Sequence, residues 1–159
     1  MDADQGGTVH VEEIFNALQV AVVDVLARMA MTEAVFVHRE KLPRFRLDQE
    51  AGGMVRLTGS QEGMIGITSP LGVVREIVSR IVSLPADQLT GEDLMDGIAE
   101  LANMIGGGTK SNAGLTNVKV STPMAMVGKE LLAEWKTDRH TERFVFQVDD
   151  GVLYVLAAL

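Results

Sequence analysis

Residues 142–159 read ERFVFQVDDGVLYVLAAL, and this stretch indicates what kind of sheet the chain forms. Two largely apolar runs, Glu142–Val148 and Val152–Ala158, flank the short segment Asp149-Asp150-Gly151. Asp and Gly are residues that a tight turn accepts, because both tolerate left-handed backbone conformations. The pattern therefore predicts a closing β-hairpin with two antiparallel strands.

The sequence before this hairpin predicts a second hairpin and several shorter strands. The turn-rich segment GSQEG (59–63) separates Met54–Thr58 from Met64–Thr68, which both have strand-like composition. Other short runs with strand-like alternation or composition lie at 34–39, 44–48, 116–121 and 123–128.

Three stretches have the signals of helices. Residues 10–30 carry apolar side chains at three- and four-residue spacing. Ser69-Pro70 is a suitable start for a second helix, with Ser69 as the N-cap. Thr90 and Asp93 form the pattern of a capping box at the start of a third helix. The glycine run 106–108 is expected to disturb the far end of this third helix.

The order of these elements predicts a single α+β domain over residues 1–159. A helix, strands, two helices and then strands favour a mainly antiparallel sheet packed with about three helices. No Pro- or Ser-rich linker divides the chain, and residues 1–9, which are acidic and Gly-rich, are expected to form a flexible N-terminal segment.

Composition excludes several classes of function. The net charge of −8 argues against nucleic acid as a partner. A membrane-spanning helix needs about 18 consecutive apolar residues, and the sequence has no such stretch. The chain has no cysteine, and His10, His38 and His140 show no metal-ligand spacing. We expect a cytoplasmic protein that binds no metal or cofactor of its own.

The third predicted helix reads GEDLMDGIAELANMIGG (91–107) and segregates its polar residues. At about 100° per residue, Asp96, Glu100, Asn103 and Gly107 fall within one narrow wedge, opposite an apolar stripe. From the residues alone, a solvated helix face explains the wedge. A weak divalent-ion site made by Asp96 and Glu100 is the alternative, and no Ser, Cys or His is placed to complete a nucleophilic pair.

The spacing of this wedge resembles a known signature. Asp96-x-x-x-Glu100-x-x-Asn103 is similar to the acidic/Ser-x3-Glu-x2-Asn motif of the chemotaxis phosphatases CheC, CheX and FliY. Glycines followed by Lys110 come directly after it, as in that family. LTNVKVSTPMAMVGKE (115–130) and the ending DGVLYVLAAL (150–159) resemble the family's later strands, and the single central motif is most similar to CheX.

The resemblance implies a function that the spacing alone does not show. It implies a phosphatase that acts on an aspartyl-phosphate response regulator, a CheY-like receiver that supplies its own Mg²⁺. Asn103 is then expected to orient the attacking water and Glu100 to dock on the receiver's lysine, with Asp96 and Gly107 as partner-binding positions. The alternative is a non-catalytic binding or scaffold domain of the chemotaxis and flagellar switch system.

Three further segments have alternative interpretations. Glu13-x-x-Asn16 in the first predicted helix is similar to a second, degenerate copy of the motif, with Val9 where an acidic residue or Ser is needed. GGGTKS (106–111) suggests a phosphate-binding loop, but a helix and not a strand precedes it. Met124–Met126 suggests an adaptable binding surface, although strand residues that fill a core are favoured.

A homodimer is also expected. The run Val152–Leu159 has apolar residues on both alternating faces, and an uncovered strand edge of that kind invites pairing with a second chain. The similarity to CheX implies a dimer as well. The alternative is a monomer in which this last strand lies centrally in the sheet and is covered by helices on both faces.

Overall fold

The computed structural model describes the backbone from Gln5 to Leu159 and the side chains from residue 11 onward. The elements, in chain order, are α1 (Gln5–Ala30), β1 (Ala34–Leu42), β2 (Phe45–Leu47), β3 (Ala51–Gly59), β4 (Gly63–Ser69), α2 (Leu71–Val82), the 3-10 turn η1 (Ala86–Gln88), α3 (Gly91–Asn112), β5 (Val118–Val120), β6 (Met124–Val127), β7 (Ala133–Trp135), β8 (Thr141–Val148) and β9 (Gly151–Ala158). The chain thus has the predicted α+β architecture.

The main sheet is antiparallel and has the order β1-β8-β9-β4-β3-β5, with β6 also paired to β3. The closing hairpin is confirmed: Val148 pairs with Gly151, and Asp149 adopts a positive φ of 52° at the turn. The second predicted hairpin is confirmed by the pairing of β3 with β4.

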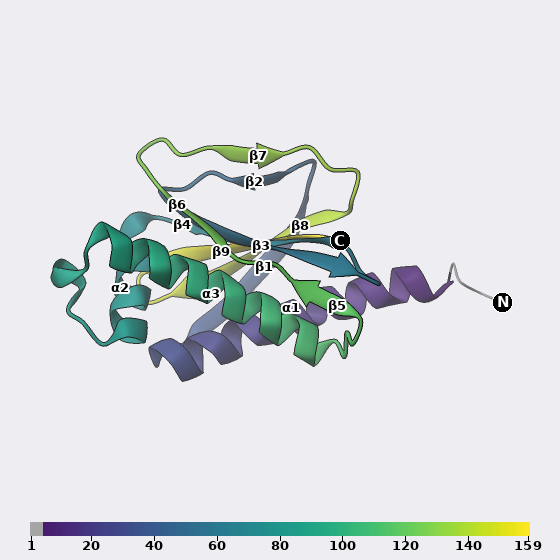
Figure 1. Cartoon of the computed structure of the whole chain (residues 1–159), viewed down its shortest axis with the longest axis horizontal. Coiled ribbons are helices and arrows are strands. Elements are labelled where there is room, and N and C mark those ends of the chain that lie inside the picture. Colours follow the sequence, from purple (N-terminus) through teal and green to yellow (C-terminus); the bar gives the residue numbers. More distant parts are fainter. Residues whose placement is uncertain (1–4) are drawn as a thin grey trace.

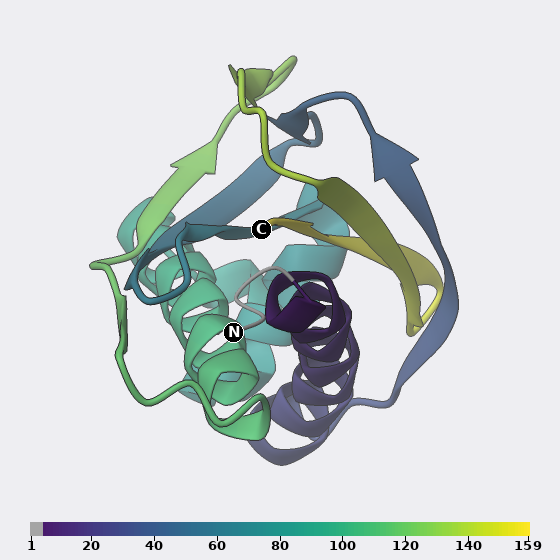
Figure 2. The same ribbon diagram turned by 90° about the vertical axis from the view of Figure 1, so that its right-hand side faces the viewer.

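The molecule has three layers. All three helices lie on one face of the sheet, and the small β2–β7 ribbon lies on the other (Figures 1 and 2). The larger core fills the space between the helices and the sheet, because the apolar stripes of α1, α2 and α3 all point there. A second, smaller core contains Phe45, Leu47, Met54, Leu156 and Ala158, under the β2–β7 ribbon.

Two details at the starts of helices differ from the predictions. The first helix begins at Gln5 and not at residue 10, while residues 1–4 of the expected flexible segment lie outside the described residues. Residues 5–9 precede the apolar stripe of α1, so the spacing of apolar residues did not predict that they are helical. Ser69 does not cap α2: its hydroxyl donates to the Val152 carbonyl at 2.6 Å, and the Glu50 carboxylate accepts from the Leu71 N–H at 3.2 Å.

The premise behind the expected edge-to-edge dimer is wrong. Strand β9 lies between β8 and β4, so the run Val152–Leu159 is in the interior of the sheet. This is the central position given in the alternative, but helices cover only one face of β9 and the β2–β7 ribbon covers the other (Figure 1). The apolar residues on its two faces therefore join two different cores. Leu153 and Val155 join the helix-covered core, whereas Leu156 and Ala158 join the core under the β2–β7 ribbon.

Candidate functional site

Helix α3 carries the predicted site, and its start is fixed by local hydrogen bonds. The Thr90 hydroxyl accepts from the Asp93 N–H at 3.0 Å, and the Asp93 carboxylate accepts from the Thr90 N–H at 3.0 Å. The predicted capping box is therefore confirmed. Such a cap stabilises a helix by about 0.5–2 kcal/mol. It also fixes the first residue of the helix, and with it the direction in which each later side chain points.

The glycine run does not disturb α3, which continues through it to Asn112. The reason is packing. A Cβ at Gly106 would lie 2.7 Å from Val55 Cγ2 of β3, and one at Gly108 would lie 3.2 Å from Ala21 Cβ of α1. On the strand side, a Cβ at Gly53 would lie 2.9 Å from Ile98 Cγ2. The absent side chains let α3 approach its neighbours closely, and the contact outweighs the low helix propensity of glycine.

The buried side of α3 leaves the predicted wedge facing solvent. Asp96 and Glu100 are exposed, and Asn103 and Gly107 are half-buried. A Cβ at Gly107 would meet nothing within 4 Å, so the surface next to Asn103 is open. Within the part of the chain that the structure describes, no side-chain hydrogen bond or ion pair holds Asp96, Glu100 or Asn103.

The chemistry available at this wedge is limited. One amide and two carboxylates stand on this helix, and residues 91–110 of α3 include no Ser, Cys or His that could act as a nucleophile or its base. The wedge lies on an open surface, because Asp96 and Glu100 are exposed and a Cβ at Gly107 would meet nothing within 4 Å. An amide and a carboxylate on such a support are suited to completing a site on another macromolecule.

The structure also places the other segments that the sequence suggested as sites. Glu13 and Asn16 are exposed on α1, and the backbone of this helix includes position 9, because α1 begins at Gln5 and not at residue 10. Segment 106–111 is wholly helical, so the phosphate-loop interpretation is wrong. Among the described residues, no three His, Cys, Asp or Glu side chains come together as metal ligands, and no helix has the length and apolarity to cross a membrane.

A comparison with protein-family models decides the family. The model of chemotaxis phosphatase CheX matches residues 51–147, a range that contains the whole wedge as well as strands β3 to β7. The chain belongs to the CheX family. Glu13 and Asn16 lie outside the matched range, so the family match concerns the copy of the motif on α3.

Solved structures have the same fold as this CheX-family chain. A chemotaxis protein CheX from Desulfovibrio desulfuricans has a TM-score of 0.83 at 20% identity, over 92% of this chain and 99% of that one. CheX from Vibrio vulnificus has a TM-score of 0.77 at 23% identity, over 92% and 98%. A CheX–CheY–BeF3–Mg²⁺ complex from Borrelia burgdorferi has a TM-score of 0.72 at 18% identity, over 91% and 96%. The comparison with curated proteins found no match.

Sequence reasoning found the wedge but not what supports it. The periodicity of 91–107 placed the polar residues on one face, and the structure confirms that they share it. Gly53 and Gly106 were missed as contact positions because a glycine in a sequence gives no sign of which neighbour approaches it. Glu50 was missed as the capping group of α2 because it lies 21 residues away from Leu71.

Proposed function

We propose that this protein removes the phosphoryl group from an aspartyl-phosphate on a CheY-like receiver. The observation that carries the proposal is the wedge itself: Glu100 and Asn103 stand side by side on the outer face of a buried, capped helix. Membership of the chemotaxis phosphatase CheX family supports it. The Borrelia burgdorferi relative, solved in complex with a CheY and Mg²⁺, supports the class of partner.

Asn103 is assigned to the attacking water. Phosphoryl transfer depends mainly on positioning and charge stabilisation, so a catalyst needs no covalent step of its own. The carboxamide oxygen accepts a hydrogen bond from the water and aligns it with the phosphorus atom. Asn103 is half-buried, and the helix below it is fixed by Ile98 and Gly106. The place of Asn103 on the outer surface of α3 is therefore set before the receiver arrives.

Glu100 is assigned to docking. It lies three residues before Asn103, on the same exposed face. We infer that it pairs with the receiver's active-site lysine, which orients the two proteins as Asn103 enters. A charge pair at an interface contributes more to orientation and specificity than to raw affinity. Asp96, one turn earlier, contributes negative charge to the same surface, and the open position at Gly107 leaves room for the receiver's backbone.

The chain supplies no metal in this mechanism. Mg²⁺ comes with the receiver and neutralises the charge of the phosphoryl group. We expect calorimetric titration of the isolated protein with Mg²⁺ or Zn²⁺ to show only weak surface association. A tight stoichiometric site would instead favour a divalent ion held by Asp96 and Glu100, and the proposed division of roles would be wrong.

We further propose a homodimer joined at the α1–β1 side of the molecule. Strand β1 is at one end of the sheet, next to α1 (Figure 2). Exposed large apolar side chains are frequent over residues 20–37, where they are Val20, Val23, Met29, Met31, Val35 and Val37. Exposed apolar side chains on and near a strand that ends the sheet are typical of a contact between chains. This edge replaces the β9 edge, which the sheet order excludes.

Phosphate release distinguishes the phosphatase from its alternative. A receiver phosphorylated in the presence of Mg²⁺ is mixed with a substoichiometric amount of this protein, and free phosphate is followed with time. A phosphatase accelerates the loss and turns over more than once. A non-catalytic binding or scaffold domain binds the receiver and leaves the rate unchanged.

A further inference from the structure

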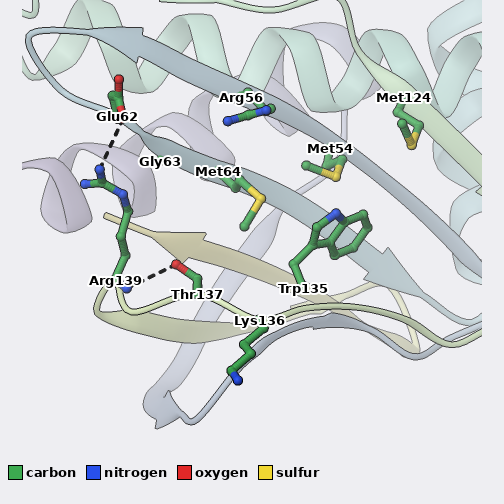
Figure 3. A pocket seen from close by; sticks show the side chains of 10 residues that line it. All are labelled: Met54, Arg56, Glu62, Gly63, Met64, Met124, Trp135, Lys136, Thr137 and Arg139. Carbon is green, nitrogen blue, oxygen red and sulfur yellow. Dashed lines mark hydrogen bonds and ion pairs between the residues drawn. The ribbon is translucent and has the colours of Figure 1, made fainter.

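A cavity on the opposite face of the sheet from α3 has no part in the proposed phosphatase site. It lies between the outer face of β3 and β4 and the segment that follows β7, and its volume is about 410 Å³ (Figure 3). Its apolar lining comes from Met54, Met64, Met124 and Trp135. Small-molecule sites in proteins commonly have volumes of about 300–1,000 Å³.

The cavity exists because the β2–β7 ribbon covers only part of the sheet. Phe45 packs on the sheet where Gly66 has no side chain: a Cβ there would lie 2.6 Å from the Phe45 ring. Trp135 packs edge-on against Phe45, with ring centroids 5.6 Å apart, and closes this small core. Beyond Trp135, the ribbon no longer covers the outer face of the sheet. Met64 is half-buried there, and Met124 is 53% exposed, although its strand position suggested a core residue.

The polar part of the lining is cationic. Arg56, Lys136 and Arg139 line the cavity together with one acidic residue, Glu62. Glu62 already pairs with Arg139 at 3.3 Å, as Figure 3 shows. Within the described residues the Arg56 guanidinium has no ion pair or hydrogen bond. A protein with a net charge of −8 thus presents an excess of positive charge at this place.

Arg56 and the apolar lining stand on the same surface. Side chains two residues apart on a strand share a face, so Arg56 lies beside Met54 on the outer side of β3. Figure 3 shows both side chains on this strand, with Trp135 opposite them and Lys136 directed away from the methionines. The cavity therefore combines an apolar lining with one guanidinium at its rim, that of Arg56, which is unpaired among the described residues.

We propose that this cavity binds a small organic anion with an apolar body. Its carboxylate or similar acidic group pairs with Arg56, whose planar guanidinium accommodates such a group with two parallel hydrogen bonds. The body lies against Met54, Met64 and the ring of Trp135. Methionine side chains are unbranched and polarizable, so they adapt to ligands of different shape. The site is separate from Glu100 and Asn103 and does not depend on the phosphatase proposal.

Trp135 makes the test direct, because it is the only tryptophan of the chain. The intact protein is titrated with sodium octanoate, well below the concentration at which it forms micelles, and tryptophan emission is recorded. Octan-1-ol and octylammonium serve as neutral and cationic probes with the same chain length. We expect a saturable change with octanoate, weaker binding of octan-1-ol and the weakest response to octylammonium. Equal responses to all three probes, or none to octanoate, would overturn the proposal.

Two further measurements fix the location. The Arg56→Gln variant is expected to bind octanoate about fivefold more weakly, with the affinity for octan-1-ol unchanged. Lys129→Gln, which removes an exposed charge outside the cavity, should bind octanoate as the unaltered protein does. With methyl-labelled methionine, the signals of Met54, Met64 and Met124 should shift on adding octanoate, and those of Met29 and Met31 should not. Unchanged octanoate affinity in Arg56→Gln, or shifts confined to α1, would contradict this site.

Discussion

Glu100 lies on the solvent-exposed face of α3, and its carboxylate has no ion pair or hydrogen bond with any described residue. If it docks on a receiver lysine, replacing it by the neutral Glu100→Gln removes a charge pair but keeps the shape. We expect receiver binding to weaken by about three- to tenfold at low salt and by less at high salt, because salt screens the pair. The measurement is receiver affinity at two ionic strengths.

The control for this prediction is Glu76→Gln, which removes the same charge from the exposed surface of α2. Its receiver affinity should match that of the unaltered protein at both salt concentrations. If Glu100→Gln loses the same affinity at both, the interaction is a hydrogen bond and not an ion pair. If Glu76→Gln has the same effect as Glu100→Gln, the loss reflects overall charge and not docking at the wedge.

At the scale of the element, two neighbouring glycines of α3 should respond in opposite ways. Gly107→Ala adds a methyl group where nothing lies within 4 Å, and alanine in a helix is favoured by about 1 kcal/mol over glycine. Gly106→Ala places its methyl group 2.7 Å from Val55, where overpacking costs about 1–3 kcal/mol. We expect the free energy of unfolding in urea to rise for Gly107→Ala and to fall for Gly106→Ala.

The same pair separates stability from docking. Gly107→Ala fills space on the proposed receiver-binding face, so we expect it to weaken receiver binding although it stabilises the fold. If both variants changed the free energy of unfolding equally, the close approach of α3 to β3 would not be the reason for the glycine run. If Gly107→Ala left receiver affinity unchanged, Gly107 would not be a partner-binding position.

How much the sequence predicts also depends on the element. Hairpins β3–β4 and β8–β9, the three helices and the capping box at Thr90 follow from local signals, and all are confirmed. Three features depend on distant contacts and were not predicted correctly. Strand β7, which pairs with β2 across more than 80 residues, was missed, the central place of β9 was given only as an alternative, and α3 was expected to be disturbed by its glycines. Propensity and period describe neighbours in the sequence, whereas these features depend on neighbours in space.

The site shows the same division. The face shared by Asp96, Glu100 and Asn103 follows from helical period alone, and the structure confirms it. Their roles do not follow from geometry, because an exposed carboxylate and an exposed amide on a helix are common. The cavity beside Trp135 had no signal in the sequence, since its walls come from β3, β4, β6, β7 and the segment after β7.

At the scale of the whole molecule, the proposed homodimer presents two copies of the wedge. Because the exposed apolar residues concentrate beside β1, we expect sedimentation at micromolar concentration to report twice the chain mass of 17.2 kDa. Val35→Glu, at a side chain that is 49% exposed on β1, should shift the protein toward the monomer. Val127→Glu, at a 37% exposed position on β6, is the matched control and should remain dimeric. A monomer in the unaltered protein would contradict the dimer and leave the wedge as it is.

Asn103 is the residue to which the proposed mechanism assigns the attacking water, and single-turnover dephosphorylation of a phosphorylated receiver tests this role. The rate is measured with saturating amounts of the unaltered protein and of Asn103→Ala, and receiver affinity is measured in parallel. We predict that Asn103→Ala lowers the stimulated rate by about a hundredfold, the scale at which loss of one positioning group acts. Receiver affinity should change by less than about twofold, because the proposal assigns Asn103 to the attacking water and Glu100 to docking on the receiver. A stimulated rate that survives in Asn103→Ala, or a receiver affinity that falls as far as the rate does, would contradict the account.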